Sequence, residues 1–161
     1  MKLLSGTLTL LAAAVMLLGN SSCASSKQEK SAITKVKYYH LDPSIQLRTL
    51  DRMISFEQQH YRHGAVDNEQ LLEKVGHYYT VFWRNDNRDS DVKLRLDYRH
   101  QSTGPKEYSF EIQPDQVKRR NTTHFAVIGD AYQKLGAVTA WKASLYINGE
   151  LVGEKKSFLW E

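Results

Sequence analysis

Cysteine is nearly absent from this chain, since Cys23 is the only one among 161 residues. A single thiol cannot form an internal disulfide, and it cannot supply the several thiolates of a structural zinc site. The sequence also has no internal repeat and no extended low-complexity tract. A chain of this length can bury a hydrophobic core without covalent or metal cross-links. We therefore expect one ordinary globular domain.

A large excess of charge of one sign is also missing. The 22 lysines and arginines stand against 18 aspartates and glutamates, and the formal net charge is +4. The two signs are well mixed along the chain, which is typical of a soluble surface rather than of a nucleic-acid-binding one. We expect no nucleic-acid partner.

No apolar run is long enough to span a membrane. The longest, residues 7–18, is shorter than the ~20 residues that a spanning helix needs. Lys2 precedes this run and small polar residues follow it, which is the order of a secretory signal. The sequence therefore predicts an export signal over residues 1–22.

Two alternatives exist for the end of this signal. Ser21, Ser22 and Cys23 resemble a bacterial lipoprotein signal, in which the cysteine is acylated and becomes the mature N-terminus, although Asn20 stands where that motif usually has leucine. The resemblance implies a lipid anchor on Cys23. Ordinary signal peptidase would instead cut after Ala24 and release a secreted or periplasmic soluble protein. Because a lone cysteine has no pairing partner in the chain, we favour lipidation.

Beyond the signal, residues 24–32 are small, polar and charged, without apolar periodicity. Such a composition is typical of a flexible tether. We expect the lipid anchor and tether to occupy residues 23–32. A single β-domain would then occupy residues 33–161, with residues 33–52 as an N-terminal arm or an extra edge strand.

From residue 33 onward, apolar residues recur mostly at every second position, as in half-buried antiparallel strands. Residues 77–83 are apolar or aromatic on both faces, as in a central strand. The spacing predicts an all-β fold, an antiparallel seven-stranded sandwich that resembles an immunoglobulin-like or fibronectin-III-like domain in architecture. The expected strands are 53–62, 77–84, 91–100, 106–112, 122–128, 137–147 and 150–160.

One short helix is expected after the first of these strands. Asp67 is suited to cap it, and Gln70 follows at the spacing of a capping box. Residues 53–62 are ambiguous between strand and helix. The alternation of Ile54 and Phe56 favours a strand there.

The last two strands are expected to form a hairpin through Asn148 and Gly149, a pair typical of a tight two-residue turn. In an unbroken register Glu154 and Lys156 would point into the core, which is costly for charged side chains. We therefore expect a bulge near Gly153, or a ribbon that projects beyond the core.

Catalytic chemistry has little support in the sequence. His60 and His63 are three residues apart, but on a strand their side chains would point to opposite sides. Neither a carboxylate nor a cysteine accompanies them at ligand spacing, so we expect solvated histidines and no metal site. The sequence has no nucleophile-elbow motif and no cofactor motif, so we expect no cofactor and no enzyme. The alternative is a secreted hydrolase or metal-dependent enzyme that uses His60 or His63.

A possible interaction surface combines aromatic and basic residues. Tyr78 and Phe82 share one face of their strand, opposite the other aromatics, so one set packs on something besides the main core. Residues 33–75 or a partner would cover that set. Lys118, Arg119 and Arg120 form a basic triplet that could contact phosphate or acidic headgroups. Three charges fall short of a lipid-binding cluster, which favours a solvated loop.

Together these patterns predict an exported protein of the bacterial cell envelope. It would be held on the periplasmic face or the cell surface by a lipid on Cys23. Its immunoglobulin-like domain would bind another envelope protein without catalysing a reaction.

Overall fold

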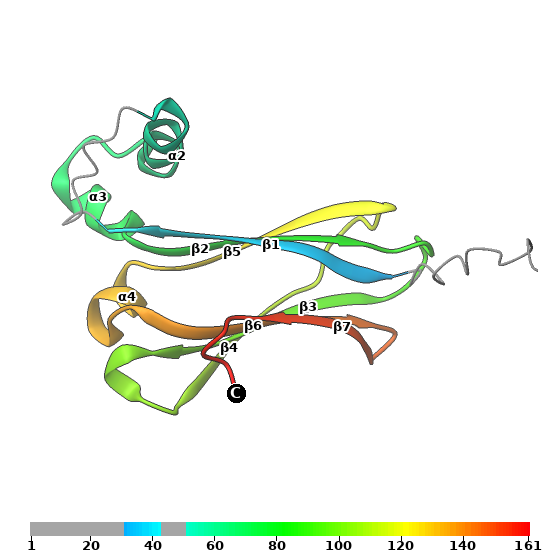
Figure 1. The fold of residues 1–161 in the computed structure, drawn as a ribbon. Coiled ribbons are helices and arrows are strands. Elements are labelled where there is room, and N and C mark those ends of the chain that lie inside the picture. The colour runs from blue at the N-terminus through cyan, green and yellow to red at the C-terminus, as the bar shows by residue number, and fades with distance from the viewer. Residues whose placement is uncertain (1–30, 43–50) are drawn as a thin grey trace, which may run out of the picture.

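The computed structural model describes residues 31–42 and 51–161, and in them two antiparallel β-sheets lie face to face (Figure 1). Sheet A has the strand order β1-β2-β5, and sheet B has the order β4-β3-β6-β7. The expectation of a mostly antiparallel all-β fold with seven strands in two sheets is confirmed. The strands are β1 (Ala32–Leu41), β2 (Gly76–Arg84), β3 (Val92–His100), β4 (Glu107–Ile112), β5 (Arg120–Ile128), β6 (Val138–Ile147) and β7 (Glu150–Lys156).

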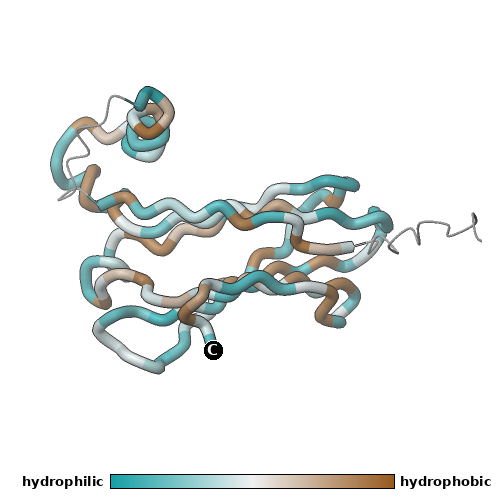
Figure 2. The backbone as a smooth tube through the Cα atoms, in the orientation of Figure 1, coloured by the Kyte–Doolittle hydropathy of each residue, from teal (hydrophilic) through white to brown (hydrophobic). Residues whose placement is uncertain are grey.

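The core lies between the two sheets and follows from the period-two pattern of the strands. Hydrophobic and hydrophilic residues alternate along both layers (Figure 2). Val81 and Trp83 of β2 meet Leu94, Leu96 and other apolar side chains of sheet B, and these four are almost fully buried. Complete burial of one such side chain stabilises the folded state by about 1.5–3 kcal/mol.

The first strand is not the one that the sequence analysis counted. Residues 32–41 form β1, an edge strand that pairs antiparallel with β2, which agrees with one of the two roles expected for residues 33–52. Residues 53–62, expected to be a strand, belong instead to the helix α2 (Arg52–Arg62). The Asp51 carboxylate accepts a hydrogen bond from the Met53 amide and caps α2. This cap, and a glutamine-rich sequence that favours helix, outweigh the alternation of two apolar residues.

Further helices flank the sheets. The expected short helix is confirmed as α3 (Asn68–Lys74), and the Asp67 carboxylate accepts a hydrogen bond from the Gln70 amide at 2.8 Å. Two more were not expected, α4 (Asp130–Leu135) and the 3-10 turn η1 (Gln101–Thr103), so the prediction of one helix was wrong. Among the described residues, no helix has the length and apolar character needed to cross a membrane.

The β6–β7 hairpin follows the predicted turn and the predicted irregularity. Asn148 and Gly149 both have positive φ, at 51° and 83°, as the tight turn requires. The register shifts by one residue beside Tyr146, so Leu145 faces Gly153 across the hairpin. This bulge leaves Glu154 and Lys156 exposed to solvent instead of pointing into the core.

The chain beyond β7 departs from the sequence analysis. The last strand ends at Lys156, four residues before the predicted end, because the Ser157 amide and hydroxyl bond the backbone of Trp141 and turn the chain. Phe158 is 98% exposed, whereas Trp160 is 6% exposed. Trp160 lies on the outer face of sheet B, where the Arg99 guanidinium and the Lys142 ammonium lie over its ring at 4.5 and 5.2 Å.

Candidate functional site

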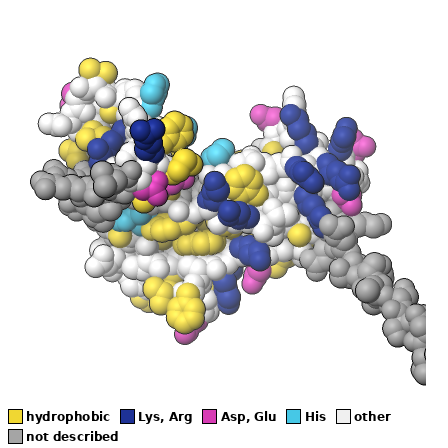
Figure 3. All heavy atoms as spheres, turned by 45° about the horizontal axis from the view of Figure 1, so that its top comes forward, with side chains coloured by type: hydrophobic (Ala, Val, Ile, Leu, Met, Phe, Trp, Pro, Cys, Tyr) yellow, Lys and Arg dark blue, Asp and Glu magenta, His cyan; other side chains and the backbone are white. Residues whose placement is uncertain are grey.

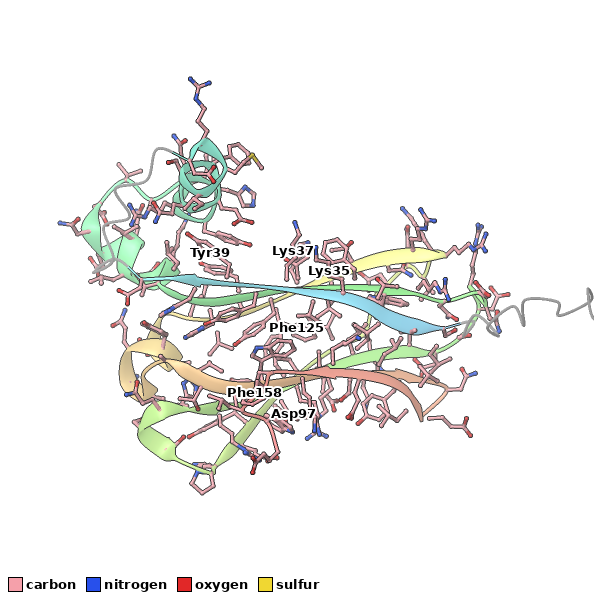
Figure 4. All side chains as sticks on the ribbon, viewed as in Figure 1. Lys35, Lys37, Tyr39, Asp97, Phe125 and Phe158 are labelled. Atoms are coloured by element: carbon pink, nitrogen blue, oxygen red, sulfur yellow. The ribbon has the colours of Figure 1, made fainter. Side chains whose placement is uncertain are left out.

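The three strands of sheet A place cations and aromatic rings on its outer face and contribute no carboxylate to it. The strands β1, β2 and β5 contain no aspartate or glutamate. Because side chains alternate between the two faces of a strand, burial of one set in the core forces the intervening set outward. Figure 4 shows Lys35, Lys37 and Tyr39 projecting from sheet A on the side away from sheet B. We call Lys35, Lys37, Phe82, Arg84 and Arg120 the basic face.

Phe82 lies at the centre of the basic face. The strand register places it beside Lys35 of β1 and Thr122 of β5. The Lys37 ammonium lies 6.0 Å from the centre of its ring. A lysine at this distance from an exposed ring is attracted by about 0.5–1 kcal/mol. The phenyl ring is half-buried, so it offers a small apolar surface that lysines border.

Two arginines face each other at the end of the basic face. Arg84 of β2 and Arg120 of β5 are directly paired across the strands. Like charges in this position repel each other and destabilise a sheet. A hollow of about 300 Å³ lies at this end of sheet A, lined by both arginines, by the aromatic Phe82 and Trp83, and by polar residues that include Thr34. Such a hollow, with two guanidinium groups at its wall, suits an anionic group.

A second hollow of about 270 Å³ adjoins the first on the side of the β4–β5 connection. Arg120 lines both hollows, and Lys118 lines the second. Asn121 holds Lys118 in a tight turn, since its side chain accepts from the Lys118 amide and donates to the Lys118 carbonyl. The fold therefore brings Arg120 of the basic triplet next to Phe82, and it places Lys118 in the adjoining hollow. The third, Arg119, is highly exposed and lies 3.6 Å from the Asp86 carboxylate.

The charges on sheet B are arranged differently. On its outer face Lys93 pairs with Glu111 at 3.4 Å, and Arg99 pairs with Glu107 at 2.6 Å. The buried Asp97 carboxylate accepts hydrogen bonds from Arg95 and from the Ser109 hydroxyl.

Lys35, Lys37 and Arg120 of sheet A form no ion pair with another described residue. Figure 3 shows dark blue side chains gathered over the surface of sheet A with few magenta ones among them. The charges of the chain nearly balance overall, but the outer face of sheet A carries cations and that of sheet B carries paired charges of both signs.

Tyr78 is separated from Phe82, with which the sequence grouped it. The Tyr61 ring of α2 lies 4.3 Å from the Tyr78 ring and 4.7 Å from the Tyr39 ring, centre to centre. The Tyr78 hydroxyl donates to the Lys74 carbonyl at 2.5 Å, and burial together with the nearby Tyr61 raises its pKa to about 12. Residues within 33–75 therefore cover one end of the outer face, which is one of the two alternatives that the sequence left open, and they leave Phe82 half-buried.

His60 and His63 lie on and just after α2, so the expectation that they alternate on a strand was wrong. They line one shallow hollow of about 220 Å³ with Phe56 and Gln59. Across the described ranges, no group of three or more histidine, cysteine, aspartate or glutamate side chains is placed to hold a metal ion.

The sequence analysis missed a cluster of histidines and tyrosines at one end of the core. The buried His77 ring stacks on His40 at 4.0 Å, and its Nε2 accepts a hydrogen bond from the Val138 amide at 2.9 Å. Its Nδ1 lies 2.7 Å from the Tyr38 hydroxyl. Burial, reinforced by His40, lowers the pKa of His77 to about 3. Both ring nitrogens of the neutral imidazole are engaged within the protein, so neither is free to act on a substrate.

This cluster could not be found from sequence spacing. Tyr38 and His40 come from β1, His77 from β2 and Tyr132 from α4, whose hydroxyl lies 2.8 Å from His40 Nε2. Only the pairing of His40 with His77 across the strands brings these groups together.

The predicted signal, the lipidation site Cys23 and most of the tether lie outside the described residues. Comparison with protein-family models, with curated proteins and with solved structures found no match to this chain.

Proposed function

We propose that this chain is an exported protein of the bacterial cell envelope, anchored by a lipid on Cys23, whose two-sheet domain acts by binding. The basic face carries this proposal. Lys35, Lys37 and Arg120 border the Phe82 ring and form no ion pair with a described residue, and such like charges on one face gain most when they meet an anionic partner. We assign this face to an anionic component of the envelope, either a partner protein or another molecule.

The same proposal includes a finer description of the fold, as an immunoglobulin-like domain of the fibronectin-III-like kind. The strand order supports it, since the chain passes between the sheets after β2, after β4 and after β5. Two facing antiparallel sheets with such crossovers are typical of these sandwiches. Their members share architecture while differing in function, so the binding role rests on the surface and not on the fold.

Mass spectrometry of the mature N-terminus tests the anchor. We expect an acylated Cys23 in the membrane fraction. Cys23→Ala should abolish acylation and shift the protein to the soluble fraction, whereas the neighbouring Ser21→Ala should leave both unchanged. A mature chain that begins at Ser25 would overturn the anchored form of the proposal and support the soluble alternative.

A further inference from the structure

We propose that the basic face docks on the anionic phospholipid surface that holds the lipid anchor, with Lys35, Lys37 and Arg120 against lipid phosphates and Phe82 at the headgroup level. This inference rests on the proposed function, because the anchor supplies the membrane.

The number of cations supports this occupant. The triplet of residues 118–120 alone is smaller than the clusters of 4–8 basic residues that bind anionic lipids. Strand pairing places Lys35, Lys37 and Arg84 on the same face as Arg120, so the basic face holds four cations. The ion pair between Arg119 and Asp86 does not involve any of these four cations. The assembled cluster therefore reaches the size at which attraction to an anionic leaflet becomes substantial.

The shape of the surface favours a membrane over a single small anion. The cations are spread across the three strands of a sheet, and neighbouring strands lie about 4.8 Å apart. Their charges can thus meet several phosphates of a planar surface at once. An aromatic ring among them suits the boundary between headgroups and acyl chains, where amphipathic and apolar side chains gather.

The position of the anchor supports it as well. Residues 23–31 can span at most about 30 Å when fully extended. β1 begins at Ala32, and Lys35 follows three residues later. A domain tethered this closely meets its own leaflet at a high effective concentration, so a modest intrinsic affinity is sufficient.

Vesicle flotation of a chain that carries no lipid tests the docking. The protein should start at residue 23 with Cys23→Ser, since every buried core residue of the described structure lies from Ile33 onward. We expect binding to phosphatidylcholine vesicles that contain phosphatidylglycerol and none to phosphatidylcholine alone. Binding should disappear in 1 M salt, where the Debye length falls to about 3 Å.

Two double variants with equal changes in net charge locate the surface. Lys35→Glu with Lys37→Glu should weaken binding at least about 30-fold, because each lysine near the surface contributes roughly a fivefold change in partition. Lys155→Glu with Lys156→Glu, on exposed positions of β7, should remain close to the unmodified chain. Circular dichroism of all proteins checks that they are folded.

Three other outcomes would overturn the docking. Equal losses in the two double variants would mean that only net charge matters. The protein could instead bind soluble polyphosphate but no vesicle, and lose that binding with Lys35→Glu and Lys37→Glu. The basic face would then be a binding site whose ligand is not the membrane. Binding to neither would exclude both a phospholipid surface and a soluble polyphosphate as ligands of the basic face, and would leave an anionic partner protein as its proposed ligand. The anchor is tested separately, because the chain in the flotation assay has no acylated cysteine.

Discussion

His77 shows how one buried side chain can make the stability of the domain depend on pH. Its neutral ring accepts from the Val138 amide, stacks on His40 and lies close to the Tyr38 hydroxyl. Burial lowers its pKa to about 3, with His40 and His100 acting in the same direction and Asp42 opposing them. In the unfolded chain the imidazole has its ordinary pKa of about 6.5. The unfolded state therefore binds a proton first as the pH falls, and stability present above pH 6.5 is lost toward pH 3.

We expect acidification from pH 7 to pH 5 to lower the free energy of unfolding by about 2 kcal/mol through His77. Urea unfolding at the two pH values measures it. His77→Gln should be less stable at pH 7, since the buried Val138 amide or the Tyr38 hydroxyl loses its partner, and should lose less stability between pH 7 and pH 5. His60→Gln, on exposed α2, controls for the loss of one histidine. Equal pH dependence in the His77 variant and the unmodified protein would refute this role.

At the scale of elements, the junction of β2 and β5 depends on the absence of a side chain. Gly76 begins β2 with φ +141°, and a Cβ atom there would lie 2.3 Å from the Val127 carbonyl oxygen and 2.9 Å from Ile128 Cα. Both contacts are with backbone, so neither can move aside cheaply. The strand that carries Phe82 and Arg84 is thus held tightly against its neighbour at this end.

Gly76→Ala should lower the free energy of unfolding by about 3 kcal/mol or more, from steric overlap together with a strained backbone. Gly149→Ala is the matched control, because Gly149 also has positive φ, at +83° in the tight turn, but a Cβ there would meet no atom within 4 Å. The control should lose only about 1 kcal/mol, the cost of the left-handed conformation. Chemical denaturation of both variants measures the difference. Similar losses would mean that the close approach of β5 has no energetic effect.

At the scale of the whole molecule, β1 joins the predicted tether to the body of the domain and also belongs to the core. Ile33 and Leu41 are 5% and 1% exposed, and β1 forms the edge of sheet A that covers β2. Among the described residues, the core begins at Ile33. The domain should therefore tolerate either predicted cleavage site but not the loss of its first strand.

Two truncations separate these cases. A chain that starts at Ser25 should unfold at the same temperature as one that starts at residue 23. A chain that starts at residue 43 lacks β1, loses two buried apolar side chains and exposes the backbone of β2, so we expect it not to fold. Thermal unfolding followed by circular dichroism distinguishes them. Cooperative unfolding of the shorter chain would show that β1 is dispensable.

Sequence periodicity by itself determined that the chain forms antiparallel strands, and local turn chemistry determined the Asn148-Gly149 hairpin and the Asp67 cap. These features depend on residues close together in the chain, so their energies are readable from spacing. The helix α2 was missed because none of its residues is buried in the core. Its apolar residues therefore show no core-facing stripe, and the Asp51 cap marks where the helix begins. The signal, the Cys23 anchor and the binding role remain predictions.

Only the tertiary structure decided what the surfaces are. Lys35, Arg84 and Arg120 are far apart in a chain of nearly balanced charge, and strand pairing alone places them on one face. The same holds for His40 beside His77 and for Trp160 over sheet B. The alternation of a strand fixes which side chains share a face, but not which strand lies next to it. A site built across strands therefore appears only when burial of the core has chosen the neighbours.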